Sequence, residues 1–488
     1  MPRVLIDVTT GRLHDRTQQA EAFEALPIFS ELVSSMTAGV DEARIWRDVK
    51  EFYQYVMLSH KWQNGEPLFQ NVKHITVYEL ETSPTHTKLQ SFCSLVRSLG
   101  FRWAWSDTCC IDKDNNVVLQ ESLVAMFTWY RGSSLTLVYL LGVSSQESGG
   151  LQESVWNTRV WTLQEYLAAE RVQFYTEDWK PYLGLTTWNH KESDTIISEM
   201  EQASKISSAG MAILKPGLDR VREKLFLASR RQTTHIEDIA YSLLGIFNVV
   251  IPVIYGEGTR SVGRLLEHLI TGSGDITILA WTGTANQYNS CLPTDLTFYR
   301  EIVPPHIPTL IKTAEVDRIV AKLRSSLPDL SAAKTLYDRL EQLPLPSLSS
   351  SRLRLPGIVS PVTRIVLTSR PDTKAKLYVY RASTTIFGDI EIKTICDLAD
   401  MTNLYVVHPW IRPLLDQDFS HDVAGSDEML RALRLLARLR QPFGAFLFWG
   451  ISRVEHKRVA PDSLIMAQVD ERVSLSQLIN NVRTIDVQ

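Results

Sequence analysis

From Tyr55 onward, short apolar runs alternate with segments of helical periodicity, and this alternation restricts the fold more than any other feature. Continuous apolar runs are typical of strands buried on both faces, whereas apolar residues spaced by three and four form one face of a helix. Their alternation predicts an α/β fold with a parallel sheet flanked by helices. The predicted elements are a strand at 55–59, a helix at 89–99, a strand at 101–107, a helix at 119–130, a strand at 134–141, a helix at 162–169 and a strand at 172–175.

The sequence pattern changes on both sides of this segment. Residues 190–270 look mainly helical, and the chain beyond about residue 280 becomes richer in strand-like runs. The features of that later part are a Ser/Pro-rich stretch at 347–356 and apolar runs at 364–368, 376–380 and 444–449. We predict four regions: an N-terminal segment at 1–50, an α/β core at 51–190, a helical extension at 191–275 and a β-rich C-terminal domain at 276–488.

Length and charge narrow the classes of function. At 488 residues the chain is about three times the usual domain length, so we expect two or three hydrophobic cores. Its 51 basic and 55 acidic residues give a net charge of -4 without a long block of one sign. This distribution argues against a nucleic-acid partner, because such proteins gather positive charge into a patch or stripe.

Cysteine use and hydropathy indicate the compartment. Five cysteines, none in C-x-x-C spacing, favour reduced intracellular thiols over structural zinc, and we expect no metal. The N-terminal sequence lacks an uninterrupted apolar segment of the secretory type, and no later stretch reaches the roughly eighteen apolar residues that span a bilayer. We therefore expect a cytoplasmic protein without a membrane partner.

Polar and aromatic side chains gather around the carboxyl ends of the predicted strands. Ligands of open parallel sheets bind there, because the loops converge and helix N-termini present free N–H groups. The candidate residues are Ser59, His60, Lys61, Trp62, Asp107, Arg159, Trp161 and Glu165.

Most candidates have a structural interpretation beside the functional one. Lys61 can meet a phosphate or be a solvated lysine, and Trp62 can stack on a base or nicotinamide ring or pack in the core. Ser59 can orient a ribose hydroxyl or cap its strand. His60 needs an oriented partner if it is to act in catalysis. Asp107 can bind a ribose or a divalent cation, or stabilise a turn.

Two further segments carry arginine near these positions. Arg159 can clamp a pyrophosphate or take part in a structural ion pair. The charge-rich segment 229–238 predicts an intramolecular network of salt bridges and caps, with a cover over the mouth of the sheet as the alternative.

Four segments in this order resemble motifs of the fungal heterokaryon-incompatibility (HET) domain family. They are YVMLSHKW at 55–62, FRWAWSDTCCID at 101–112, RVWTLQEYL at 159–167 and ASRRQTTHIEDIAYSLLGIFNVVIPVIYGEG at 228–258, the last being similar to basidiomycete members. The resemblance implies a TIR/flavodoxin-like parallel sheet and a role in non-self recognition that ends in programmed cell death. It also implies self-association through this domain.

TIR domains of several lineages cleave NAD with a glutamate in a W-C-x-x-E motif, and Trp161-Thr-Leu-Gln-Glu165 is similar to that motif. The resemblance implies that Glu165 is the catalytic residue of an NAD glycohydrolase, with NAD as substrate, no cofactor, and the other candidates binding the substrate. A fixed carboxylate suffices chemically, because the leaving group is already cationic and needs no general acid. Thr162 replaces the motif's cysteine, and Tyr55 stands where an acidic residue is frequent.

The same residues allow other hypotheses. Thr162-x-x-Glu165 fits a capping box, in which both side chains bind free N–H groups at a helix start. The capping and catalytic roles do not exclude each other. A second hypothesis, favoured if Glu165 points only at its own helix end, is a non-enzymatic signalling or scaffold module whose C-terminal domain recognises an unknown protein partner. A third hypothesis is recruitment of the fold to small-molecule metabolism.

Overall fold

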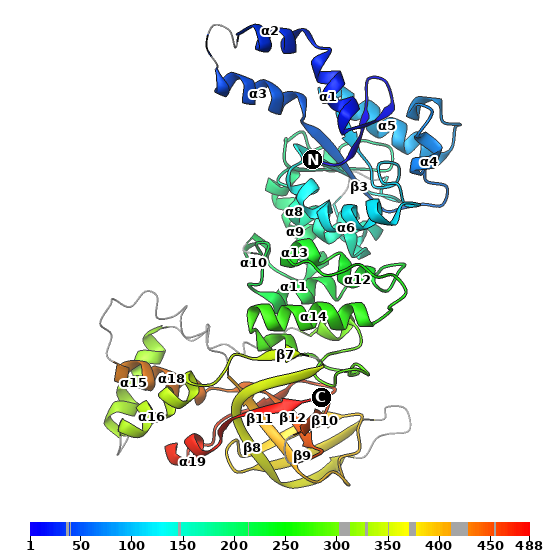
Figure 1. The fold of residues 1–488 in the computed structure, drawn as a ribbon. Helices are drawn as coiled ribbons and strands as arrows, with labels where there is room; N and C mark the ends of the chain where they lie inside the picture. Colours follow the sequence, from blue (N-terminus) through cyan, green and yellow to red (C-terminus); the bar gives the residue numbers. More distant parts are fainter. Residues whose placement is uncertain are drawn as a thin grey trace. The chain divides into compact units, whose positions relative to one another are not determined.

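The chain forms two compact units (Figure 1). The computed structural model describes residues 1–35, 39, 41–144, 148–212, 214–301, 313–326, 330–349, 351–369, 377–410, 428–452 and 455–488. Unit 1 comprises Met1–Gly217 and Arg230–Tyr255, and unit 2 comprises Leu218–Ser229 and Gly256–Gln488. The backbone therefore passes between the units after residues 217, 229 and 255.

Unit 1 contains a six-stranded mixed sheet in the order β2-β1-β4-β3-β5-β6. The strands β4, β3, β5 and β6 are parallel to one another, whereas β1 is antiparallel to both β2 and β4. The predicted α/β architecture with parallel strands is therefore confirmed. The strands are β1 Val4–Asp7, β2 Arg12–Asp15, β3 Tyr55–His60, β4 Trp103–Trp105, β5 Leu135–Tyr139 and β6 Val172–Tyr175.

The four parallel strands lie within two residues of their predicted bounds. All residues of β3 are buried, which accounts for its continuous apolar run. β4 is shorter than predicted because a turn follows it, in which the Cys110 N–H donates to the Ser106 carbonyl at 2.9 Å.

The predicted helices of the core are also confirmed, with earlier starts for the first two. The first begins earlier because the Ser83 side chain accepts the His86 N–H at 3.2 Å and Pro84 occupies the first helical position. Asn115 caps the second helix in the same way. The three helices are α5 Pro84–Ser98, α6 Asn116–Arg131 and α8 Trp161–Ala168.

The N-terminal segment adds a hairpin that the sequence patterns did not predict. β1 and β2 pair with each other, and β1 joins the sheet beside β4. The fully buried Asp7 of β1 accepts hydrogen bonds from Arg102 Nε at 3.0 Å and Nη2 at 2.8 Å, which compensate its charge. The helices of this segment are α1 Arg16–Glu24, α2 Pro27–Ser35 and α3 Glu42–Phe52.

The segment from Arg230 to Tyr255 returns to unit 1 and packs on α6 and α8. Gly245 lies so close to α6 that a Cβ atom there would come within 2.1 Å of the Phe127 Cβ. Glycine is therefore required at this contact. The shorter helices of unit 1 beyond β5 are α7 Gly150–Glu153, α9 Asp194–Ser204, α10 Ser208–Ala212, α12 Asp238–Tyr241 and α13 Leu244–Phe247.

Unit 2 is rich in strands, as predicted. Among the described residues its sheet has nine strands in the order β10-β9-β8-β11-β12-β13-β15, with β7 paired to β8 and β14 to β12. The predicted runs at 364–368 and 444–449 lie in β8 and β12. Of the run at 376–380, residues 378–380 lie in β9, and residue 376 is outside the described residues. The strands are β7 Ser347–Ser349, β8 Arg352–Ser369, β9 Tyr378–Thr384, β10 Asp389–Thr394, β11 Leu404–Pro409, β12 Phe443–Gly450, β13 Glu455–Arg458, β14 Ile465–Ala467 and β15 Val482–Val487.

Each unit has a hydrophobic core of its own. In unit 1, buried side chains of β5 and β6 pack against α9, and in unit 2 the sheet packs against α15, α16 and α18. No described helix combines the length and the apolar character that a bilayer crossing requires. The helices of unit 2 are α11 Val221–Ala228, α14 Arg260–Ser273, α15 Thr313–Ser326, α16 Leu330–Glu341, α18 Glu428–Leu439 and α19 Leu475–Asn480.

Candidate functional site

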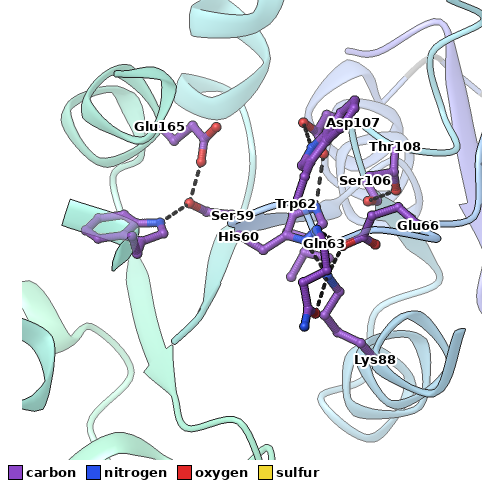
Figure 2. A network of polar contacts seen from close by, with 12 residues as sticks. Ser59, His60, Trp62, Gln63, Glu66, Lys88, Ser106, Asp107, Thr108 and Glu165 are labelled. Atoms are coloured by element: carbon purple, nitrogen blue, oxygen red, sulfur yellow. Dashed lines mark hydrogen bonds and ion pairs between the residues drawn. The ribbon is translucent and has the colours of Figure 1, made fainter. Parts of the chain in front are cut away.

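Ser59, near the carboxyl end of β3, is the centre of a buried polar contact. Its hydroxyl donates to a carboxylate oxygen of Glu165 in α8 (Figure 2). The same hydroxyl oxygen accepts a hydrogen bond at 2.7 Å from the indole Nε1 of Trp156, which lies just before α8. Glu165 is only 5% exposed. The structure therefore brings together two candidates from the sequence and adds Trp156, which no sequence pattern indicated.

The capping-box interpretation of Thr162 and Glu165 is wrong. α8 begins at Trp161 after Val160, and no side chain caps its first turn. Thr162 lies inside the helix, where its hydroxyl donates to the carbonyls of Trp156 at 2.7 Å and Arg159 at 2.9 Å. The carboxyl group of Glu165 is therefore directed to β3 and away from the N-terminus of its own helix.

The surroundings of Glu165 favour its protonated form. Burial and then the negative charge of Asp107 raise the pKa of Glu165 to about 8. The Ser59 hydroxyl and the charges of Arg159 and Arg231 lower that pKa, but by less. At neutral pH most molecules therefore keep a proton on Glu165.

Arg231 extends the contact from the charge-rich segment at 229–238. Its Nη1 donates to the Arg159 carbonyl at 2.9 Å and to the Thr162 hydroxyl at 2.8 Å. Burial lowers the pKa of Arg231 to about 10, so its guanidinium stays charged at neutral pH. This part of the segment forms an intramolecular hydrogen-bond network at the start of α8.

His60 lies on the other side of β3 from Ser59 (Figure 2), because neighbouring residues of a strand point to opposite faces. Its Nε2 lies 3.1 Å from Oδ1 of Asp107, and its Nδ1 lies 2.8 Å from Nζ of Lys88. Burial and then the charge of Lys88 lower the pKa of His60. His60 is therefore a neutral imidazole with an oriented partner on each nitrogen.

Asp107 follows β4 and joins this second network to solvent, since 22% of its side chain is exposed. Its other oxygen, Oδ2, accepts the Trp62 Nε1–H at 2.7 Å. The Lys113 Nζ lies 3.7 Å from the centroid of the Trp62 ring. Burial would raise the pKa of Asp107, but the hydrogen bond from His60 and the charge of Lys113 lower it. Asp107 is therefore a carboxylate at neutral pH.

Lys88 in α5 and Glu66 in the loop after β3 form a buried ion pair beneath His60. Neither residue is among the candidates taken from the sequence. Lys88 did carry a signal, because it lies on the same face of α5 as the buried Leu89 and Phe92. Glu66 lies in a loop, where periodicity offers no such signal.

The side chains of the three remaining candidates make none of the hydrogen bonds described above, and all three residues are partly buried. The side chain of Lys61 has no hydrogen bond or ion pair within the described part of the chain. Arg159 offers its backbone carbonyl to Arg231 and Thr162, and its charge lowers the pKa of Glu165. Trp161 is the first residue of α8.

Cys109 and Cys110 follow Asp107 directly, and both are buried free thiols. Burial raises the pKa of Cys110 well above its ordinary value, so the thiol stays protonated. Such buried thiols behave as small apolar side chains. Among the described residues, no group of His, Cys, Asp and Glu has the arrangement of a metal site.

Comparison with known families connects this geometry to a class of protein. Residues 55–151 match the family model described as "Heterokaryon incompatibility protein (HET)", which confirms the resemblance to the HET domain for that segment. The matched segment contains Ser59, His60 and Asp107 and ends before Glu165.

One relative extends the similarity. The chain is 32% identical over 230 residues to "Vegetative incompatibility protein HET-E-1" of Podospora anserina. The alignment covers 44% of this chain and 16% of that protein, so the chain spans about a sixth of the relative's length. No solved structure matches the chain.

Proposed function

We propose that this protein acts in fungal non-self recognition leading to cell death and that it cleaves NAD at the nicotinamide–ribose bond through a TIR-like site. The similarity of residues 55–151 to the HET domain and the vegetative-incompatibility relative support the biological role. One observation carries the chemistry: Glu165 contacts Ser59 at the carboxyl end of a central parallel strand and does not cap its own helix.

The proposed reaction breaks the bond between the ribose C1′ and the nicotinamide nitrogen. The bonding electrons leave with nicotinamide, and positive charge develops on the ribose carbon. Water then forms the new C1′–O bond, and the products are ADP-ribose, nicotinamide and a proton. In cyclisation, a nitrogen of the adenine base takes the place of water. A carboxylate beside the ribose stabilises the developing cation, which is the role proposed for Glu165.

Glu165 must lose its proton to act in this way. The proton is held by burial and by the charge of Asp107. A cationic nicotinamide ring placed at the strand ends would oppose both effects, because a nearby positive charge favours the ionised carboxylate. We propose that Asp107 and Trp62 contact the substrate, as do Lys61, Arg159 and Trp161, while the Ser59 hydroxyl keeps Glu165 oriented.

The test is incubation of the purified full-length chain with NAD, followed by chromatographic measurement of nicotinamide. We expect turnover by the wild type and a loss of at least about a hundredfold in Glu165→Gln, because electrostatic stabilisation of this kind is a large part of catalysis. Glu170→Gln, at an exposed position just beyond α8, is the matched control and should keep wild-type activity. Equal turnover by wild type and Glu165→Gln would reject the proposed site.

The same assay at several protein concentrations tests self-association. We propose that activity depends on contact between copies of the HET-like domain, so specific activity should rise with concentration in step with the oligomer measured by light scattering. A specific activity that stays constant while the oligomer population changes would remove self-association from the proposal.

A non-enzymatic signalling module is the second candidate function. The observation in its favour is that the groups of the Ser59–Glu165 contact already have partners within the protein. Glu165 is buried, and the Ser59 hydroxyl already accepts a hydrogen bond from Trp156. In this hypothesis the contact only fastens α8 to β3. Cell-death signalling that persists in a folded Glu165→Gln variant would favour the module, whereas loss of signalling together with NAD turnover would favour the enzyme.

A further inference from the structure

The Lys88–His60–Asp107 chain has a definite direction of hydrogen bonding. A lysine ammonium group has three donors and no acceptor, so the Lys88 Nζ at 2.8 Å requires His60 Nδ1 to accept. The imidazole proton must then reside on Nε2, which donates to Asp107 Oδ1 at 3.1 Å. The Lys88 donor on one side of His60 and the Asp107 acceptor on the other therefore fix a single tautomer of the imidazole.

Asp107 receives a second obligatory donor. The indole of Trp62 can only donate, and its Nε1 lies 2.7 Å from Oδ2. Each oxygen of Asp107 therefore accepts one N–H group, which suits the ionised carboxylate and restricts rotation of the side chain. A carboxylate oxygen has two acceptor sites, so one site on each oxygen stays available to a ligand.

Burial separates the parts of this chain. The side chains of His60 and Lys88 are each 2% exposed, whereas that of Asp107 is 22% exposed. A ligand in solution can therefore reach Asp107 and cannot reach the imidazole. The groups that face His60 are Lys88 from α5, Glu66 from the loop after β3 and Asp107 after β4.

We propose that Lys88 and His60 are positioning residues that keep the Asp107 carboxylate charged and oriented at the strand ends, where it attracts a cationic ring of the ligand. The Lys88 charge is balanced by Glu66, and His60 is neutral, so Asp107 carries the negative charge at the exposed end of the network, with Lys113 as the neighbouring charge of opposite sign. The cationic ring is that of NAD if the proposed function is correct. The tautomer of His60 does not depend on that function.

Nuclear magnetic resonance of the full-length chain labelled with ¹⁵N-histidine tests the tautomer directly, with His60→Gln used to assign the signal. We expect a protonated Nε2 and an unprotonated Nδ1 that persist from about pH 6.5, the ordinary pKa of histidine, up to about pH 8. A proton on Nδ1, or conversion to the imidazolium within this range, overturns the proposal.

Removal of the lysine charge provides the second measurement. In Lys88→Met, His60 loses its donor on Nδ1 but keeps two acidic neighbours, so its imidazole should become protonated near neutral pH. The double variant Lys88→Met/Glu66→Gln avoids the unpaired Glu66 carboxylate and serves if the single variant does not fold. An imidazole that stays neutral in the folded variant would show that Lys88 does not set the tautomer.

Ligand binding separates this inference from the proposed function. We expect Asp107→Asn and His60→Phe to weaken binding of NAD by about tenfold, the size of one charge-assisted contact, and to leave binding of NADH, whose nicotinamide ring is neutral, unchanged. His60→Gln keeps an N–H donor for Asp107 and should restore most of the NAD affinity. Equal losses for NAD and NADH would overturn the role of Asp107. Selective binding of NAD without turnover would retain the positioning residues and reject the enzyme.

Discussion

Each side of β3 holds one acidic side chain, and the pKa values of the two are shifted in opposite directions. On the Ser59 side, Glu165 is buried and keeps its proton up to a pKa of about 8. On the His60 side, Asp107 has a lowered pKa although burial opposes it. Asp107 differs because His60 and Trp62 donate hydrogen bonds to its two oxygens and because the charge of Lys113 lies nearby. The number and kind of donors, in addition to depth, therefore decide the ionisation of each acid.

The largest expected effect is on the Glu165 side of β3 and is a change in how the free energy of unfolding depends on pH. An unfolded glutamate ionises near pH 4.5, whereas folded Glu165 keeps its proton to a pKa of about 8. Between these two pKa values the folded state keeps a proton that the unfolded state has lost. The contribution of Glu165 to the free energy of unfolding is therefore fully present below the unfolded pKa and is lost as the pH rises through the folded pKa. Glu165→Gln cannot ionise and should gain roughly 4 kcal/mol relative to wild type between about pH 4.5 and pH 9.

Urea unfolding of wild type and Glu165→Gln at a series of pH values measures this difference. Exposed Glu170→Gln is the control and should follow the wild type at every pH. A constant difference between wild type and Glu165→Gln across the series would mean that Glu165 ionises normally in the fold, and the contrast with Asp107 would then disappear.

The ion pair on the His60 side should have the next largest effect. Lys88→Met leaves the buried Glu66 without its partner and should lower the free energy of unfolding by about 3 kcal/mol. Adding Glu66→Gln removes the unpaired charge and should restore more than half of that loss. A double variant no more stable than Lys88→Met would show that the two residues do not act as a pair.

Ser59 offers a smaller and separate test of the first side. Ser59→Ala removes the acceptor of the Trp156 N–H and the donor to Glu165, and should cost about 2 kcal/mol because buried polar groups lose their partners. Ser94→Ala, on the exposed face of α5, is the control and should have little effect. Similar unfolding curves for the two variants would mean that the Ser59 contact adds nothing to stability.

The smallest effect is expected at Lys113. It lies over the Trp62 ring, and its charge lowers the pKa of the partly exposed Asp107. Lys113→Met should raise the pKa of Asp107 and change stability by less than about 1 kcal/mol, as is usual for pairs near solvent. Titration of the Asp107 carboxyl ¹³C signal would detect the shift, and a lower pKa in the variant would contradict it.

The order of the core elements could be predicted from the sequence because each has a strong apolar period. β3 and β6 are fully buried strands made largely of apolar residues, and α5 and α6 have one apolar face. The hairpin of β1 and β2 could not be predicted from the sequence, since its strands are four residues long and β2 has no buried residue. Short strands at a sheet edge leave little period to detect.

The candidate site was predictable as a location and less so as a set of contacts. The rule that loops meet at the carboxyl ends of parallel strands correctly indicated that Ser59 and Glu165 lie near each other. The sequence pattern misplaces the start of α8, because threonine is a favourable N-cap residue. In the structure the preceding turn makes Trp161 the first helical residue. The Glu66–Lys88 pair joins a loop to a helix, which no local pattern encodes.

The path of the backbone limits how this protein can be shortened. Because residues 218–229 leave unit 1 and residues 230–255 return to it, no single cut separates the units. A chain that stops at residue 217 loses Arg231 and the Gly245 contact with Phe127, whereas one that stops at residue 255 retains α11 without the rest of its own unit. A chain that lacks residues 218–229 and ends at residue 255 would respect both boundaries. Isolation of unit 1 therefore requires an internal deletion, because a simple truncation removes part of unit 1 or retains part of unit 2.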